Sequence, residues 1–125
     1  MVYQKFSLYK LGRSFRYAFR GVIFLLANEQ NARVHAVITI VVGIAAYVFD
    51  VSRLEAAILF IAVILVFAIE IINTAIEKVF DVCHPEGHRL IASAKDAMAG
   101  AVLISAVIAT VAAILIFLPY FKALF

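Results

Sequence analysis

The C-terminal part of the chain contains a long stretch without a charged residue. From Ala97 to Phe121 every side chain is apolar, small or uncharged. This stretch is longer than the ~20 apolar residues that a helix needs to cross a bilayer. A second stretch, Ala56 to Ile69, is also fully apolar. These two stretches restrict the chain to folds in which lipid forms part of the solvent.

The composition agrees with this restriction. The chain has 125 residues, of which 66% are hydrophobic and 15% charged, and its mean hydropathy is +1.09. Soluble domains are nearer half apolar and a quarter charged. A chain of this size has too little interior to hide so much apolar side chain. We therefore predict an all-α membrane protein of a single domain, 1–125.

The N-terminal segment predicts an amphipathic surface helix over residues 5–29. Its apolar residues recur at helical spacing on one side, and its arginines lie on another. The residues concerned are Phe15, Phe19, Val22 and Leu26, and Arg13, Arg16 and Arg20. A basic amphipathic helix of this kind lies in the membrane interface. The alternative is a basic soluble helix that packs on a neighbour.

Three transmembrane helices are predicted, at 31–49, 54–80 and 93–119. A polar turn at 50–53 separates the first two, and Pro85 and Gly87 mark a loop before the third. Ser93 is expected to cap the third helix, with Asp96 as the acid of a capping box. Small residues recur every fourth position along this helix and predict a packing seam: Ala97, Ala101, Ser105, Ala109 and Ala113.

The basic residues predict the orientation of the chain. Six precede the first span, three flank the second loop, and two lie on the opposite side. They are, in these three groups, Lys5, Lys10, Arg13, Arg16, Arg20 and Arg33; Lys78, Arg89 and Lys95; Arg53 and Lys122. Because cytoplasmic segments carry the excess of basic residues, the N-terminus and the 78–95 region are expected in the cytoplasm. The net charge of +3 suits an anionic leaflet or a polyphosphate substrate, and nothing indicates nucleic-acid binding.

The second span carries a stripe of polar residues on one face. Glu70, Asn73, Thr74, Glu77 and Asp81 follow one another at i, i+3, i+4, i+7 and i+11. Placing even one acid in hydrocarbon costs roughly 2.5–3.5 kcal/mol. A purely structural helix gains nothing from that cost, so the acids are expected to face a polar cleft, a cation or one another.

The chemistry of this stripe suits phosphoryl transfer. Glu70 and Glu77 lie two turns apart and could serve as a base and a metal ligand, with a cation or a lysine nearby to balance their charge. Glu29 and the pair Lys95-Asp96 lie near the same membrane face as Glu77. Mg²⁺ takes one or two carboxylates together with phosphate oxygens, and a lysine neutralises phosphate charge.

Simpler interpretations exist for several of these residues. Asp81 could be a solvated residue at the helix end, and Asn73 and Thr74 could join helices by hydrogen bonds. Glu29 could be an exposed interfacial acid. The loop residues that could help to bind a nucleotide could equally be a solvated loop: His84, Glu86, His88 and Arg89.

The polar stripe resembles that of a known family. The string Glu70-Ile-Ile-Asn73-Thr74-Ala75-Ile76-Glu77 with Asp81, followed by Ala94-Lys95-Asp96, is similar to the prokaryotic diacylglycerol kinase and undecaprenol kinase family. The resemblance extends from about Phe15 to Phe117. It implies a small membrane-embedded lipid kinase, in a homotrimer, that uses ATP and Mg²⁺ in the bacterial cytoplasmic (inner) membrane.

The resemblance also implies a role for each matching residue. Glu70 matches the general base, Asn73 and Lys95 match groups that hold the γ-phosphate, and Glu29 and Glu77 match the metal ligands. Positions around the nucleotide are matched by Tyr17, Glu86, His88 and Asp96. Asp81 matches a recurring acid without an assigned role. Gly87, preceded by Pro85, departs from the family pattern, in which an aromatic residue usually occupies its position.

The resulting hypothesis is a lipid kinase that phosphorylates undecaprenol or diacylglycerol. The segment from Glu29 to His35 and the pair Asn73-Thr74 look more like the undecaprenol branch. The main alternative is a non-enzymatic cation-binding channel or transporter subunit, since carboxylates in spans also serve ion pathways. Lys95 beside the acids favours the kinase. A lipid-phosphate phosphatase would need a nucleophile or an arginine pair that the sequence does not offer convincingly.

Overall fold

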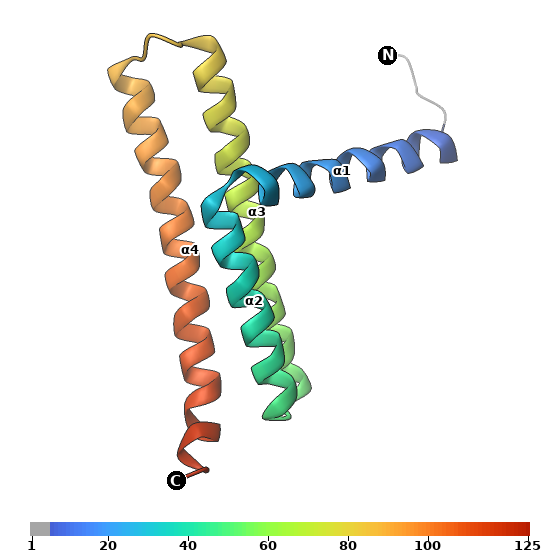
Figure 1. Ribbon diagram of the computed structural model, residues 1–125, viewed down its shortest axis with the longest axis vertical. Coiled ribbons are helices and arrows are strands. Elements are labelled where there is room, and N and C mark those ends of the chain that lie inside the picture. The colour runs from blue at the N-terminus through green and yellow to red at the C-terminus, as the bar shows by residue number, and fades with distance from the viewer. Residues whose placement is uncertain (1–5) are drawn as a thin grey trace.

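The computed structural model describes residues 6–125, and this part of the chain forms four helices (Figure 1). Three of them are long and apolar enough to span a membrane. Their bounds are α1 Leu8–Asn28, α2 Gln30–Val48, α3 Arg53–Cys83 and α4 Arg89–Lys122. The predicted all-α fold with three membrane helices is confirmed. Residue 5, the expected start of the surface helix, lies outside the described residues.

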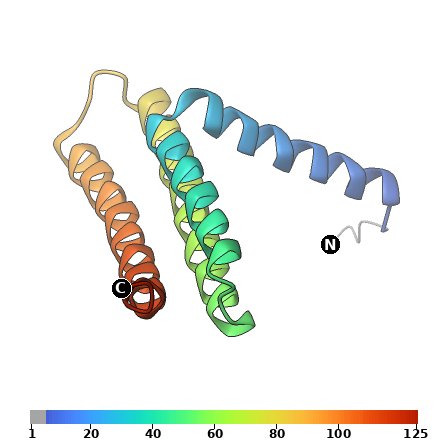
Figure 2. The ribbon, with the colours of Figure 1, turned by 60° about the horizontal axis from the view of Figure 1, so that its bottom comes forward.

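Helix α1 leaves the bundle crosswise, as Figures 1 and 2 show. Ser7 caps its first turn by accepting a hydrogen bond from the backbone N–H of Lys10. Most of its side chains are exposed, and Leu25 near its end is buried. The chain turns at Glu29, whose extended backbone separates α1 from α2. A basic amphipathic helix that leaves a membrane bundle crosswise has the geometry of a surface helix.

The core of the bundle is an antiparallel pair, α3 and α4, with α2 packed mainly on α3 (Figure 1). The predicted seam of small residues faces inward from Ala101 onward, with Ser105 3% exposed, whereas Ala97 is exposed. Ala113 packs against the cluster of Leu59, Ile116 and Phe117. Small side chains let helices approach closely, which drives their association where lipid is as apolar as the helix surface.

The turn between α2 and α3 is tied to the end of α4. Ser52 and Glu55 form a capping box at the start of α3, and the Tyr120 hydroxyl donates a 2.6 Å hydrogen bond to Glu55. The ring of Phe49 lies against three aromatic rings of α4, those of Phe117, Tyr120 and Phe121. These contacts fix the end of the bundle opposite the polar stripe.

Helix α4 begins four residues earlier than expected. The Nδ1 atom of His88 accepts a 3.2 Å hydrogen bond from the backbone N–H of Leu90, so His88 is the N-cap. The prediction that Ser93 caps this helix is wrong, because its hydroxyl lies inside the first turns and donates to the Arg89 carbonyl. Gly87, at φ +80, turns the chain just before the cap, so the helix can start there.

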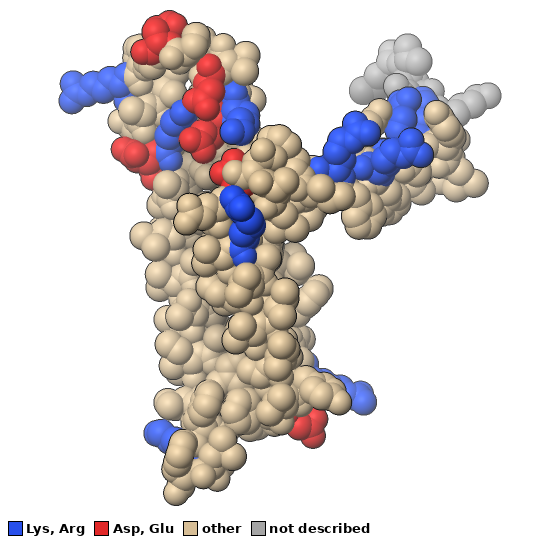
Figure 3. Space-filling view, viewed as in Figure 1, with Lys and Arg blue, Asp and Glu red and all other residues tan. Residues whose placement is uncertain are grey.

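Along the bundle, the face drawn in Figure 3 has three zones of charge. Acidic and basic side chains gather at the end that carries the α3–α4 loop, a broad uncharged band follows, and a few charged residues mark the opposite end. Large apolar side chains such as Phe60, Leu103 and Leu115 are more than 60% exposed within the band. Exposed apolar surface of this extent requires a bilayer around it, so this is a multi-pass membrane protein.

Candidate active site

The polar stripe on α3 runs from the interior of the bundle to its charged end. Glu70 is 2% exposed and Thr74 is 6% exposed, while Asn73 is half-buried and Glu77 is exposed. One face of one helix therefore presents a buried carboxylate at its deep end and a solvated carboxylate two turns away.

Glu70 is the most deeply buried charged residue of the described chain. One of its oxygens, Oε2, is buried and has no hydrogen-bond partner among the described residues. Its carboxylate interacts electrostatically with His35, Glu29 and Glu77. Buried polar atoms are nearly always hydrogen-bonded, because an unsatisfied one is costly. An oxygen held in this way is suited to accept a proton or a hydrogen bond from a bound molecule.

A pocket of about 230 Å³ lies beside Glu70. Helices α2 and α3 give it a polar side, formed by Asn31, His35, Glu70 and Asn73. Helix α4 gives it an apolar side. The sequence left the role of His35 open, because its spacing does not reveal which face of α2 meets α3. The structure places it in the pocket of the buried acid.

An apolar groove adjoins this pocket. It has a volume of about 220 Å³, is lined by α2, α3 and α4, and shares His35 and Ala106 with the Glu70 pocket. The hydroxyls of Thr39 and Thr110 in its wall donate to backbone carbonyls, so these two side chains offer the groove no free donor. The groove could therefore accommodate a hydrocarbon chain beside the Glu70 pocket.

A second polar pocket, of about 310 Å³, lies toward the charged end of the bundle. Its lining includes Asn73, Glu77, Lys95 and Asp96. Asn73 lines both polar pockets and so stands between the buried acid and the lysine. The structure thus brings the predicted residues of α3 and α4 together.

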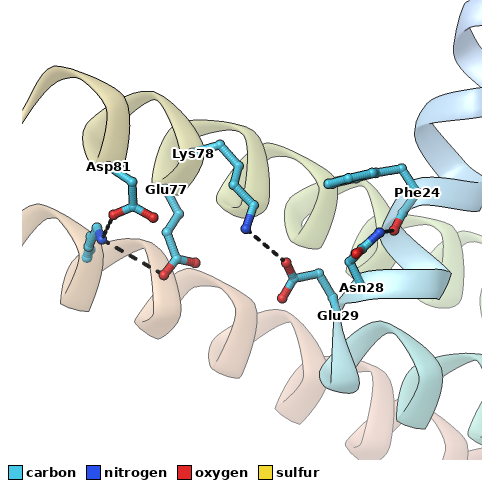
Figure 4. Close-up of polar contacts among 7 residues, drawn as sticks. Phe24, Asn28, Glu29, Glu77, Lys78 and Asp81 are labelled. Carbon is cyan, nitrogen blue, oxygen red and sulfur yellow. Dashed lines mark hydrogen bonds and ion pairs between the residues drawn. The ribbon is translucent and has the colours of Figure 1, made fainter. Parts of the chain in front are cut away.

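Lys95 is held between two acids of α3 (Figure 4). Its ammonium bonds to Asp81 and lies 4.0 Å from a carboxylate oxygen of Glu77. From the sequence alone, Asp81 has no assigned role. The contact shows that Asp81 holds Lys95. Helical spacing could not reveal this pair, because the two residues lie on different helices, fourteen positions apart in the sequence.

The two predicted metal ligands lie on either side of Lys78 in Figure 4. Glu29 lies 3.8 Å from the Lys78 ammonium. Among the described residues there is no group of three or more His, Cys, Asp or Glu side chains that could hold a metal ion. Two carboxylates still suit Mg²⁺, which keeps waters and takes phosphate oxygens as its other ligands. Glu29 and Glu77 are therefore candidates for holding a divalent cation.

The residues expected around the nucleotide do not all line one pocket. Asp96 lines the Lys95 pocket, and His88 lines a neighbouring pocket of about 220 Å³ with Asp81 and Lys95. Glu86 is exposed on the loop, where it faces His84 at 4.0 Å. Tyr17 lies on α1, with its ring against Arg20, and the helix carries it away from the bundle (Figure 1). Within the described chain, Tyr17 does not meet the other predicted site residues.

Comparison with known proteins identifies the family of this chain. The prokaryotic diacylglycerol kinase family matches residues 16–117, a range that includes every candidate site residue. The chain belongs to this family. Its members in this comparison are named as kinases of membrane lipids, so the chain is a lipid kinase rather than a channel or transporter subunit.

Three relatives show how broad the similarity is. Undecaprenol kinase of Bacillus subtilis is 38% identical over 90% of this chain and 92% of its own length. Diacylglycerol kinase of Synechocystis is 36% identical over 85% of this chain and 61% of its own length. Diacylglycerol kinase of Escherichia coli K12 is 34% identical over 76% of this chain and 78% of its own length. This family member therefore has relatives named for two different acceptor lipids.

Proposed function

We propose that this lipid kinase transfers the γ-phosphoryl group of ATP, with Mg²⁺, directly to the hydroxyl of undecaprenol or diacylglycerol. The observation that carries the proposal is the buried Glu70 carboxylate, placed where a polar pocket meets an apolar groove. A lipid alcohol brings a hydrocarbon chain and one hydroxyl to the same point. This arrangement suits an acceptor that arrives from the bilayer.

The proposed reaction assigns one task to each residue. Glu70 accepts the proton of the lipid hydroxyl as its oxygen bonds to the γ-phosphorus, and the bond from that phosphorus to the bridging oxygen breaks to release ADP. Asn73 and Lys95 hold the γ-phosphate, and Asp81 positions Lys95. Asp96, His88 and Glu86 contribute to the nucleotide site. A Mg²⁺ ion held by Glu29 and Glu77 would neutralise phosphate charge when bound.

The assembly and acceptor are also part of the proposal. The family resemblance supports a homotrimer, and by the same resemblance Tyr17 on α1 belongs to the proposed nucleotide site. The relative from Bacillus subtilis, named as an undecaprenol kinase, matches over most of both chains and supports undecaprenol as acceptor. Two other relatives, named as diacylglycerol kinases, keep diacylglycerol in the proposal.

The first prediction is Mg²⁺-dependent phosphorylation of a lipid alcohol. Purified protein in mixed micelles is given ATP labelled at the γ-phosphate, with undecaprenol and diacylglycerol in parallel reactions. Label is expected in at least one extracted lipid, because the buried base and the phosphate-binding lysine both line the site. EDTA should stop the transfer and excess Mg²⁺ should restore it. A folded protein that labels neither lipid would contradict the proposed function.

The second prediction concerns orientation in the cytoplasmic membrane. The nine basic residues that precede the first span or flank the second loop in the sequence predict that the α3–α4 loop is cytoplasmic. In a Cys83→Ser background, Glu86→Cys should react with an impermeant maleimide only after spheroplasts are opened. Ala123→Cys, beyond the other end of the bundle, should react in sealed spheroplasts. The reverse pattern would overturn the predicted topology.

A further inference from the structure

Lys78 joins the metal-binding end of α3 to the junction between α1 and α2. It follows Glu77 in the sequence, and its ammonium lies 3.8 Å from a carboxylate oxygen of Glu29. The lysine side chain is 55% exposed and that of Glu29 is 27% exposed. In Figure 4 the Lys78 side chain extends from α3 toward Glu29. The pair is accessible to ions from solution.

Each acid proposed as a metal ligand therefore has an ammonium beside it. Glu77 lies 4.0 Å from Lys95, which is also bonded to Asp81. If a cation takes Glu77, Lys95 retains Asp81 as its carboxylate partner. Lys78 differs, because its ion pair in the described chain is with Glu29, the carboxylate that the cation would also use.

We propose that Lys78 is an internal competitor for the divalent cation at Glu29. The ammonium occupies the carboxylate until a divalent cation displaces it, so Lys78 raises the cation concentration at which the site fills. An exposed ion pair is weak, and like charges at this range repel only moderately in a solvated site. The competition is thus strong enough to tune metal binding and too weak to prevent it. The inference rests on the proposed function, because it takes Glu29 as a ligand.

A competing role and a purely structural role predict effects of opposite sign. If Lys78 competes, its removal frees Glu29 and strengthens cation binding. If Lys78 instead holds Glu29 in the geometry that the cation needs, its removal leaves the carboxylate mobile and weakens binding. The direction of the change in affinity therefore separates the two roles.

The test measures binding of Mn²⁺ to the purified protein in neutral detergent, without nucleotide, by loss of the free-ion electron paramagnetic resonance signal. Lys78→Gln is expected to lower the Kd for Mn²⁺ by about three- to tenfold. Lys78→Arg keeps the charge and should stay within about twofold of the parent. Lys122→Gln removes an equal charge at the opposite end of the bundle and should also leave the Kd unchanged.

A double variant places the effect at Glu29. In a Glu29→Gln background, Lys78→Gln should no longer change the Kd, because the carboxylate for which the two cations compete is gone. An unchanged or raised Kd for Lys78→Gln alone overturns the inference, as does a parent protein that binds no Mn²⁺. The labelled-phosphate assay on the same preparations tests the proposed function separately, because lipid phosphorylation does not depend on the direction of this shift.

Discussion

Glu70→Gln is expected to lower the turnover number for lipid phosphorylation by about 10²–10⁴-fold, which is the usual loss when a general base is removed. Glutamine keeps the size of the side chain and its capacity for hydrogen bonds, but it cannot accept the hydroxyl proton. Glu70 is the deepest acid on α3 and has a buried oxygen without a partner among the described residues. Because it lies away from the Lys95 pocket, affinity for ATP should be largely retained.

A matched control comes from the same helix. Glu55→Gln makes the same chemical change at the opposite end of α3, where glutamine can still accept the Tyr120 hydrogen bond. Its turnover should remain within about threefold of the parent. Both variants are measured for lipid phosphorylation and ATP binding on protein of native size. If Glu70→Gln also stayed within about threefold, the base would have to be sought elsewhere, with Asp96 as the next candidate.

The second large effect is expected for Lys95→Met, which should reduce turnover by about 10²–10³-fold. Losses of this size follow the removal of one preorganised group that stabilises charge in the transition state. The lysine is preorganised because Asp81 and Glu77 hold its ammonium at the edge of the 310 Å³ pocket. Methionine keeps much of the length and removes the charge, so the γ-phosphate loses its cation.

Lys122→Met serves as the control for this change, since it removes a lysine from the far end of the same helix. Its turnover should be close to that of the parent. Lys95→Met should also weaken binding of ATP more than Glu70→Gln does, because Lys95 lies in the pocket assigned to phosphate. Equal ATP affinity in the parent and Lys95→Met, together with unchanged turnover, would remove Lys95 from the proposed site.

Several residues of the site could be recognised from helical spacing alone. The polar stripe from Glu70 to Asp81 lies on one helix, so its residues share a face wherever that helix packs. The assignment of roles within the stripe came from chemistry and from the family resemblance, and those roles stay predictions. Helical spacing could not reveal that Ser93 lies inside α4 and is not its N-cap. Capping motifs are short, so more than one residue can match them. Here the chain turns at Gly87 and His88 caps the helix, so α4 begins at Arg89, before Ser93.

The three spans, the basic amphipathic helix and the acid stripe could be recognised from the sequence, because hydrophobic length and 3.6-residue periodicity are local properties. Which helix faces meet became clear only from the folded structure. It placed His35 beside Glu70, Asp81 against Lys95 and Lys78 against Glu29. Each of these contacts joins residues of two different helices. In a bilayer, helices associate through close packing of small side chains rather than through burial from water, so the pattern of apolar residues does not reveal which faces meet.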